Sequence, residues 1–159
     1  MGHKLCLVVV IIVILIMTAV AYGLMHTTIS ALSRPGPFET AIATKAKEWF
    51  ISRGAHSVPA APAHSVSSGS DGEMLFGMGC ATCHGKDGRN ATPIGGSMYP
   101  RVLDLGSPEV QHLSDRELFW VVKNGIRFSG MPGFARILSD EQIWDLTHYV
   151  RSLGNHPKR

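Results

Sequence analysis

Five consecutive residues, Cys80-Ala81-Thr82-Cys83-His84, constrain the fold of this chain more than any other part of its sequence. Two thiols and an imidazole at this spacing are typical of a disulfide pair, a metal site, a redox-active dithiol or a covalent attachment point for a larger group. The chain has only three cysteines. That number is too small for a disulfide framework, and too small for a structural zinc site unless distant histidines join.

The region from residue 69 to residue 154 predicts three helices, because Ser is followed three residues later by Glu or Gln at three places, a pattern typical of a capping box. The three boxes are Ser70 with Glu73, Ser114 with Glu117, and Ser139 with Gln142. Gly125 and Gly154 are the expected ends of the second and third helices. We therefore expect an all-α domain.

A long irregular segment separates the first two predicted helices. Almost thirty residues there have little regular pattern, apart from a short helix predicted at Ser107-Pro108. A loop of this length is unusual inside a compact domain, and a domain of under 90 residues with so much loop buries a marginal core. A large apolar cofactor, wrapped by the loop, explains both features.

The motif itself is the attachment signature of c-type haem. Each thiol adds to one haem vinyl group, and two intervening residues let Cys80 and Cys83 reach neighbouring pyrroles. His84 then becomes the proximal iron ligand. Its other ring nitrogen is expected to donate to a backbone carbonyl, for which Pro93 is the candidate. The alternative is a thioredoxin-like dithiol, which needs a βαβ arrangement, and no strand is predicted before Cys80.

Met131 is the candidate for the sixth ligand of the iron. Its neighbours Gly130, Pro132 and Gly133 favour a rigid turn that lets the backbone approach the haem. Met98, in the wrapping loop, is the second candidate, and an iron that is open or ligated by histidine is the third possibility. A buried methionine is otherwise a common core residue.

Residues 5–25 form an apolar run of 21 residues without formal charge. As a helix it would span about 31 Å, the thickness of a bilayer core. We expect residues 1–25 to be a retained single-pass anchor with the remaining chain outside the cytoplasm. A cleaved signal peptide, with Ala19-Val20-Ala21 as its cleavage site, is the alternative.

Residues 26–68 are expected to connect the anchor to the haem domain, 69–154, which a tail of residues 155–159 follows. A short helix is predicted over residues 38–52, and a Pro/Ala/Ser tether over residues 57–70. Trp49 and Phe50, beside Lys45 and Lys47, are expected either at the membrane surface or packed on the next domain or on a partner.

The charge distribution excludes nucleic acid as an expected partner. The net charge is +3 over the whole chain, and residues 69–154 hold 8 basic and 10 acidic residues. Balances this small give no basic surface for a phosphate backbone.

The sequence resembles the class I cytochrome c family over residues 69–154. Gly72 and Phe76 match the first helix of that family, Leu146 and Tyr149 match the last helix, and CATCH and GMP match its haem and methionine motifs. The resemblance implies three main helices around one covalently bound haem c with iron, preceded here by a transmembrane helix. The anchored layout is similar to membrane-bound monohaem cytochromes of bacterial respiratory or photosynthetic chains.

The resemblance implies an electron carrier without substrate turnover of its own. We expect it in the bacterial cytoplasmic membrane, with the haem domain on the periplasmic side. Expected partners are the lipid bilayer and redox complexes: a quinol-oxidising complex, a terminal oxidase or a photosynthetic reaction centre. One alternative is a haem subunit bound permanently to an oxidase or a reaction centre. Another is a haem-based gas or peroxide sensor or enzyme.

Overall fold

The computed structural model describes residues 2–26, 30, 33–62, 69–89 and 91–155. Every regular element within these residues is a helix, which confirms the all-α prediction. The chain divides into two compact units, Met1–Ser33 and Arg34–Arg159. The domain boundaries at residues 25, 68 and 154 stay predictions.

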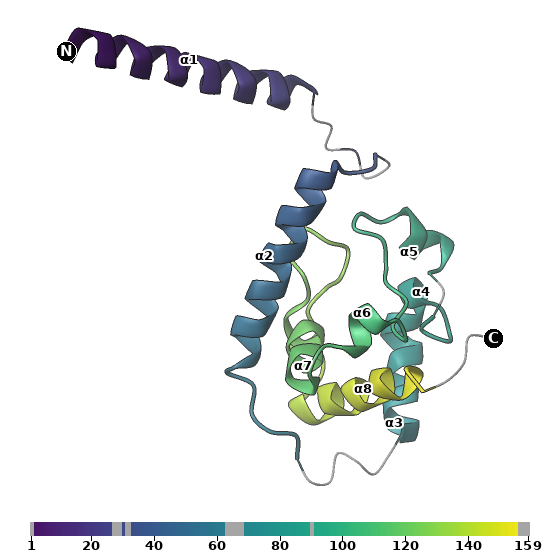
Figure 1. The fold of residues 1–159 in the computed structure, drawn as a ribbon. Coiled ribbons are helices and arrows are strands. Elements are labelled where there is room, and N and C mark those ends of the chain that lie inside the picture. The colour runs from purple at the N-terminus through teal and green to yellow at the C-terminus, as the bar shows by residue number, and fades with distance from the viewer. Residues whose placement is uncertain (1, 27–29, 31–32, 63–68, 90, 156–159) are drawn as a thin grey trace. The chain divides into compact units, whose positions relative to one another are not determined.

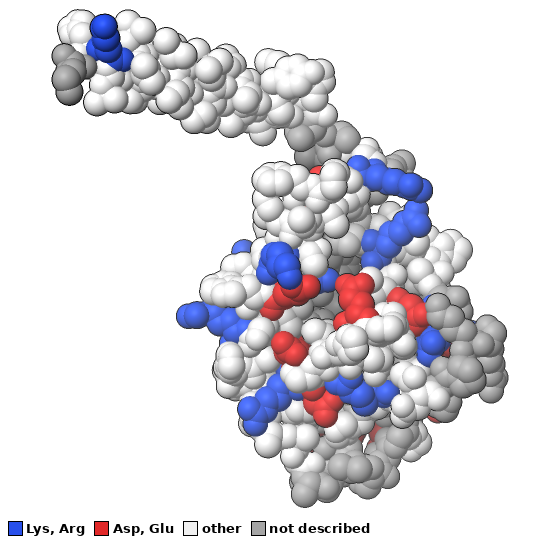
Figure 2. All heavy atoms as spheres, viewed as in Figure 1, with Lys and Arg blue, Asp and Glu red and all other residues white. Residues whose placement is uncertain are grey.

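The first unit contains helix α1, Gly2–His26, which is long and apolar enough to cross a membrane. A signal sequence near the N-terminus passes the same test of length and composition, so both expectations for this segment stay open. Lys4 is the only charged residue of α1, and Figure 2 shows the helix as uncharged except near its start.

Helix α2, Pro37–Ala55, belongs to the second unit and packs on α7, Asp115–Asn124. Ile51 and Ala55 are the buried side chains of α2. Val58, which falls in the predicted tether, is 7% exposed and joins a core cluster with Phe119, Ile143 and Trp144. The chain after α2 is therefore part of the core as far as Val58, and residues 63–68 of the tether lie outside the described residues.

The segment that leads to the motif is continuously helical. It comprises α3 (Gly69–Leu75), one π-helical turn η1 (Phe76–Cys80) and α4 (Ala81–His84). The predicted capping box at Ser70 is wrong, because the helix already begins at Gly69 and Ser70 lies inside its first turn. The Ser70 hydroxyl lies 3.5 Å from the carboxylate of Asp71 instead.

The other two capping boxes are confirmed. Ser114 caps α7, and Ser139 caps α8, Asp140–Leu153. The wrapping loop contains α6, Pro108–Gln111, at the place predicted, and also α5, Pro93–Ser97, which was not predicted. Thr92 caps α5, and Pro93 occupies its first turn, a combination that the sequence signals in advance.

Helix α8 runs across α3, as Figure 1 shows, and Gly72 lies at the crossing. A Cβ atom added at Gly72 would overlap the carbonyl oxygen of Asp145 and would lie 2.9 Å from Cβ of Tyr149. The rings of Phe76 and Tyr149 meet beside this point with centroids 5.2 Å apart. Leu146 is 1% exposed. The four residues that match the class I family therefore form one helix crossing.

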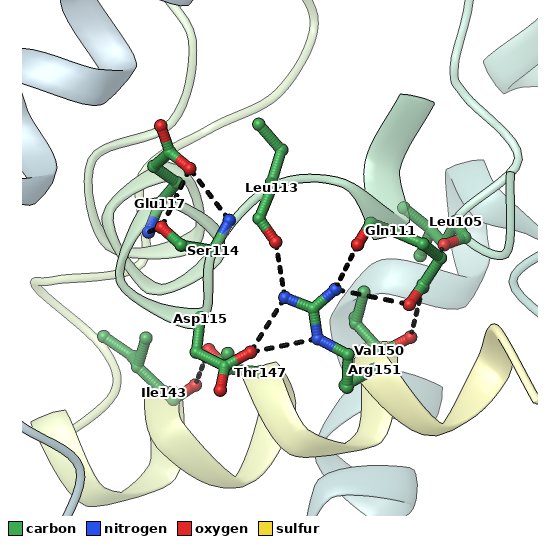
Figure 3. Close-up of polar contacts among 10 residues, drawn as sticks. All are labelled: Leu105, Gln111, Leu113, Ser114, Asp115, Glu117, Ile143, Thr147, Val150 and Arg151. Carbon is green, nitrogen blue, oxygen red and sulfur yellow. Dashed lines mark hydrogen bonds and ion pairs between the residues drawn. The ribbon is translucent and has the colours of Figure 1, made fainter. Parts of the chain in front are cut away.

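Arg151 of α8 ties this helix to the turn between α6 and α7 (Figure 3). Its guanidinium donates to the carbonyl oxygens of Gln111 (2.7 Å) and Leu113 (2.6 Å) and to the carboxylate of Asp115 (2.8 Å). Backbone carbonyls in this turn lack helical partners, and the arginine satisfies two of them. The C-terminal part of the wrapping loop is thereby fixed on α8.

Candidate functional site: the Cys-X-X-Cys-His helix and the Met131 loop

The structure brings Cys80, Cys83 and His84 together on one helical segment. Cys80 ends the π-helical turn, and Cys83 and His84 end α4. Both cysteines are free and half-buried. Gly85 follows with φ 78°, a conformation in which other residues are strained, so the helix ends directly after His84.

His84 has a defined orientation. Its Nδ1 lies 3.2 Å from the carbonyl oxygen of Leu103, so an Nδ1–H tautomer donates there and leaves the lone pair of Nε2 available to a metal. The expectation of a carbonyl partner is confirmed, but the choice of Pro93 is wrong. Pro93 lies in the first turn of α5, and the chain must continue through residues 98–102 before a carbonyl faces the imidazole.

The back of the motif is held by Thr92 and Gly95. The Thr92 hydroxyl donates to the carbonyl oxygen of Thr82 (2.7 Å), and its backbone N–H donates to that of Cys83 (3.1 Å). A Cβ atom at Gly95 would overlap the carbonyl of Cys83. Only glycine lets α5 approach α4 this closely, so the backbone of residues 92–95 packs directly on the backbone of the motif.

The electrostatics of the thiols disfavour a redox-active dithiol. Burial, together with the nearby Cys83, raises the pKa of Cys80 to about 11. A nucleophilic cysteine requires a lowered pKa, because the thiolate is the reactive form. Burial also lowers the pKa of His84, against the opposing hydrogen bond to Leu103, and so favours the neutral imidazole that ligates metals.

Met131 lies on a loop that folds back on the end of α7. Its carbonyl oxygen accepts from the backbone N–H of Ile126 (3.2 Å), and its own N–H donates to the Ser129 hydroxyl (3.2 Å). A Cβ atom at Gly133 would lie 2.6 Å from the carbonyl oxygen of Asn124. Gly130 and Gly133, the two glycines predicted to shape the turn, are therefore both closely packed: Gly133 on the backbone of α7 and Gly130 on the side chain of Met98.

Two contacts connect this loop to the rest of the site. The sulfur of Met98 lies 2.5 Å from the position that a Cβ atom of Gly130 would take. The ring of Phe134 lies 3.4 Å from the corresponding position at Gly79, next to Cys80. Both candidate thioether ligands therefore belong to loops that meet each other, and the Met131 loop also reaches the helix of the motif.

The residues fit a covalently bound haem. Two thiols at the spacing of the attachment signature and one oriented imidazole are the groups that haem c requires. Three apolar side chains on the segments around the motif are exposed: Met78 (68%), Ile94 (56%) and Leu103 (39%). A large apolar ring seated on the motif would cover such side chains. Among the described residues, no three His, Cys, Asp or Glu side chains gather as a metal site of their own.

Sequence reasoning missed the carbonyl of Leu103 and the Thr92–Gly95 clamp. Thr-Pro at residues 92–93 was a usable signal for α5, because Thr is a good N-cap and Pro suits the first turn. No local signal identifies Leu103, which acts through a carbonyl that every residue has.

Comparisons with known proteins find one family and two solved structures that are similar to this chain. A sequence model of the family "Cytochrome C oxidase, cbb3-type, subunit III" matches residues 67–150, just over half of the chain. No curated protein sequence matches the chain.

Two solved structures are similar. One is the Kuenenia stuttgartiensis reducing HAO-like protein complex Kustc0457/Kustc0458, at 26% identity and a TM-score of 0.51, covering 61% of this chain. The present chain spans 47% of the length of that protein. The other is the KustC0563 c-type cytochrome, at 30% identity and a TM-score of 0.47, covering 52% of this chain and 96% of that one. The family implies haem c with iron, and the chain belongs to the family of cbb3-type cytochrome c oxidase subunit III, with a class I-like cytochrome c domain.

Proposed function

We propose that this protein is a membrane-anchored electron carrier with one haem c, held by Cys80 and Cys83 and ligated by His84 and Met131. The observation that supports it most is the orientation of His84, whose Nδ1 faces the Leu103 carbonyl at 3.2 Å. That hydrogen bond fixes the ring and would leave Nε2 to ligate the iron. When bound, the haem supplies an iron that changes between the ferric and ferrous states.

The chain's own residues would keep this site rigid. The Thr92–Gly95 clamp holds the carbonyls of the motif, and the close contacts of Gly133 hold the Met131 loop. A rigid ligand set lowers the rearrangement that accompanies electron transfer. A thioether ligand favours the reduced iron and raises the reduction potential.

The experiment compares three proteins: the wild type, Met131→Ala and Met98→Ala. The wild type is expected to keep its haem through an acidified acetone wash and not to bind carbon monoxide when reduced. Met131→Ala is expected to bind carbon monoxide and to have a lower potential. Met98→Ala, in which the neighbouring thioether is removed, is expected to behave as the wild type does. The reverse pattern would assign the ligand to Met98, and haem lost in the wash would refute covalent attachment.

Carbon monoxide binding by the wild type would favour the sensor or enzyme alternative over the carrier. His112 and His148, the two histidines that follow the motif within the haem domain, lie at the C-terminus of α6 and within α8 rather than on the Met131 loop. A distal acid or base next to the iron, which peroxide chemistry needs, would have to come from elsewhere.

The haem domain is proposed to lie on the periplasmic side of a bacterial cytoplasmic membrane, held by α1. Its donors and acceptors are proposed to be membrane redox complexes of a respiratory or photosynthetic chain. A tether of this kind raises the local concentration of the haem domain near its redox partners, so its affinity for them can be low and docking can be weak and fast.

A second candidate function is a permanent haem subunit of a terminal oxidase, which the description of the matched family favours. Purification in mild detergent separates the two. A permanent subunit co-purifies with haem-containing partners at fixed stoichiometry, whereas a tethered carrier is recovered alone.

A further inference from the structure

Helix α2 has apolar side chains on two opposite faces. One face packs on α7 through Ile51 and Ala55. Phe38, Ile42 and Trp49 form the opposite face, where they are 77%, 54% and 56% exposed. At 100° per residue these three positions lie within about 40° of one another. We call them the outer face of α2.

The packing of α2 on the domain is close, so the outer face has a fixed direction relative to the domain. A Cβ atom added at Gly54 would lie 2.8 Å from Cζ2 of Trp120 in α7. Lys47 pairs with Glu109 of α6 (3.4 Å), and the Tyr99 hydroxyl donates to Glu39 (3.2 Å). Whatever binds the outer face therefore also orients the haem domain.

Basic side chains flank the outer face. Lys45 has a side chain that is 84% exposed, and the Arg53 guanidinium lies 5.4 Å from the centre of the Trp49 ring. Glu48 pairs with Lys45 at 3.2 Å and reduces its charge. Aromatic and aliphatic side chains between basic residues are typical of helices that lie in the headgroup region of a bilayer. Figure 2 shows uncharged atoms over the N-terminal end of α2.

The chain keeps α2 near any bilayer that contains α1. Ten residues separate His26, the end of α1, from Pro37, the start of α2. A fully extended segment of this length reaches about 40 Å at most. Phe38, the first residue of the outer face, is at the end of α2 nearest to α1 along the chain. A lipid surface is therefore within reach whenever α1 is embedded.

We propose that the outer face of α2 binds the surface of the lipid bilayer in which α1 is anchored, and thereby sets the direction in which the haem domain faces. The proposal rests on the membrane anchoring in the proposed function. It goes beyond it, because a tether alone leaves the domain free to rotate.

The test uses the full haem-loaded chain in protein-free lipid vesicles of phosphatidylcholine, with and without phosphatidylglycerol. In a Cys6→Ser background, Ile42→Cys and Thr40→Cys are compared for their rate of reaction with a membrane-impermeant maleimide. Thr40 is exposed and only two residues away, but about 200° around the helix from Ile42. It is a matched control for depth along α2. The visible spectrum of each variant checks that the domain is folded.

We expect Ile42→Cys to react at least about tenfold more slowly than Thr40→Cys in vesicles, with stronger protection when phosphatidylglycerol is present. Equal rates would overturn the proposal. So would protection that disappears when the protein is diluted in lipid, which indicates a second copy of the chain. Protection found only in native membranes, which indicates a protein partner, would overturn it as well. Failure of the anchoring gives a different signature, because the chain would then stay in the supernatant when the vesicles are sedimented.

Discussion

Gly72→Ala tests the helix crossing that defines the haem domain. The added Cβ atom would overlap the carbonyl oxygen of Asp145 and would lie 2.9 Å from both the carbonyl carbon of Asp145 and Cβ of Tyr149. Two of these atoms belong to backbone, which cannot rotate away as a flexible side chain could. The helices α3 and α8 would have to separate.

The magnitude follows from two opposing terms. Overpacking against well-packed neighbours costs about 1–3 kcal/mol, and overlap with backbone argues for the upper end, about 3 kcal/mol. Alanine favours a helix over glycine by about 1 kcal/mol. The expected loss is therefore about 2 kcal/mol in the free energy of unfolding. For a domain of this size that corresponds to a melting temperature lower by about 8–16 °C.

The control is Gly77→Ala, in the π-helical turn that follows α3, where an added Cβ atom meets nothing within 4 Å. It should not lower the melting temperature. Thermal unfolding is measured on the full haem-loaded chain in detergent, from the helical circular dichroism signal, with the visible haem spectrum as a second probe. A Gly72→Ala protein that melts within 2–3 °C of the Gly77→Ala protein would refute the close crossing of α3 and α8.

Three further predictions concern stability and titration. Arg89→Met is expected to lower the free energy of unfolding by about 3 kcal/mol, because it leaves the largely buried Asp104 carboxylate without the guanidinium at 3.1 Å. In chemical denaturation, adding Asp104→Asn should recover part of that loss, and the absence of any recovery would contradict the pairing. Ser139→Ala removes the capping box of α8 and should cost about 1 kcal/mol, measured in the same way. Burial, Glu73 and Asp87 raise the pKa of Tyr149, so the phenol should ionise above its ordinary range in an ultraviolet titration, and Glu73→Gln should lower that pKa. Because the folded pKa exceeds the unfolded pKa of about 10, the stabilising contribution of the neutral phenol should be lost as the pH rises above about 10.

Helix ends were predictable wherever a short-range signal sets them. Ser114 and Ser139 cap their helices as the sequence indicates, because the capping hydrogen bonds join residues three apart. Ser70 has the same pattern, but the helix begins one residue earlier, and its hydroxyl contacts Asp71. The pattern marks a helix start at Ser114 and Ser139, where the preceding residue is not helical. It does not mark one at Ser70, because Gly69 is already helical.

The faces of α2 were not predictable from its composition. Its sequence has apolar residues around the whole helix, so periodicity does not single out a buried side. In the structure α2 packs on α7, where Trp120 lies against Gly54, and Ile51 and Ala55 are buried whereas Trp49 and Phe50 are exposed. The helix therefore packs on the domain through residues other than Trp49 and Phe50, and the expectation that these two side chains lie at the membrane surface stays a prediction.

The sequence by itself determined the spacing of the motif residues and the starts of α7 and α8. The spacing of Cys80, Cys83 and His84 is fixed by covalent geometry within five residues, and capping depends on neighbours along the chain. The tertiary structure alone decided that Leu103 orients His84, that Gly95 lets α5 approach the motif, and that Met98 contacts the Met131 loop. These contacts join segments that are far apart in sequence, and they form only when the whole domain has packed.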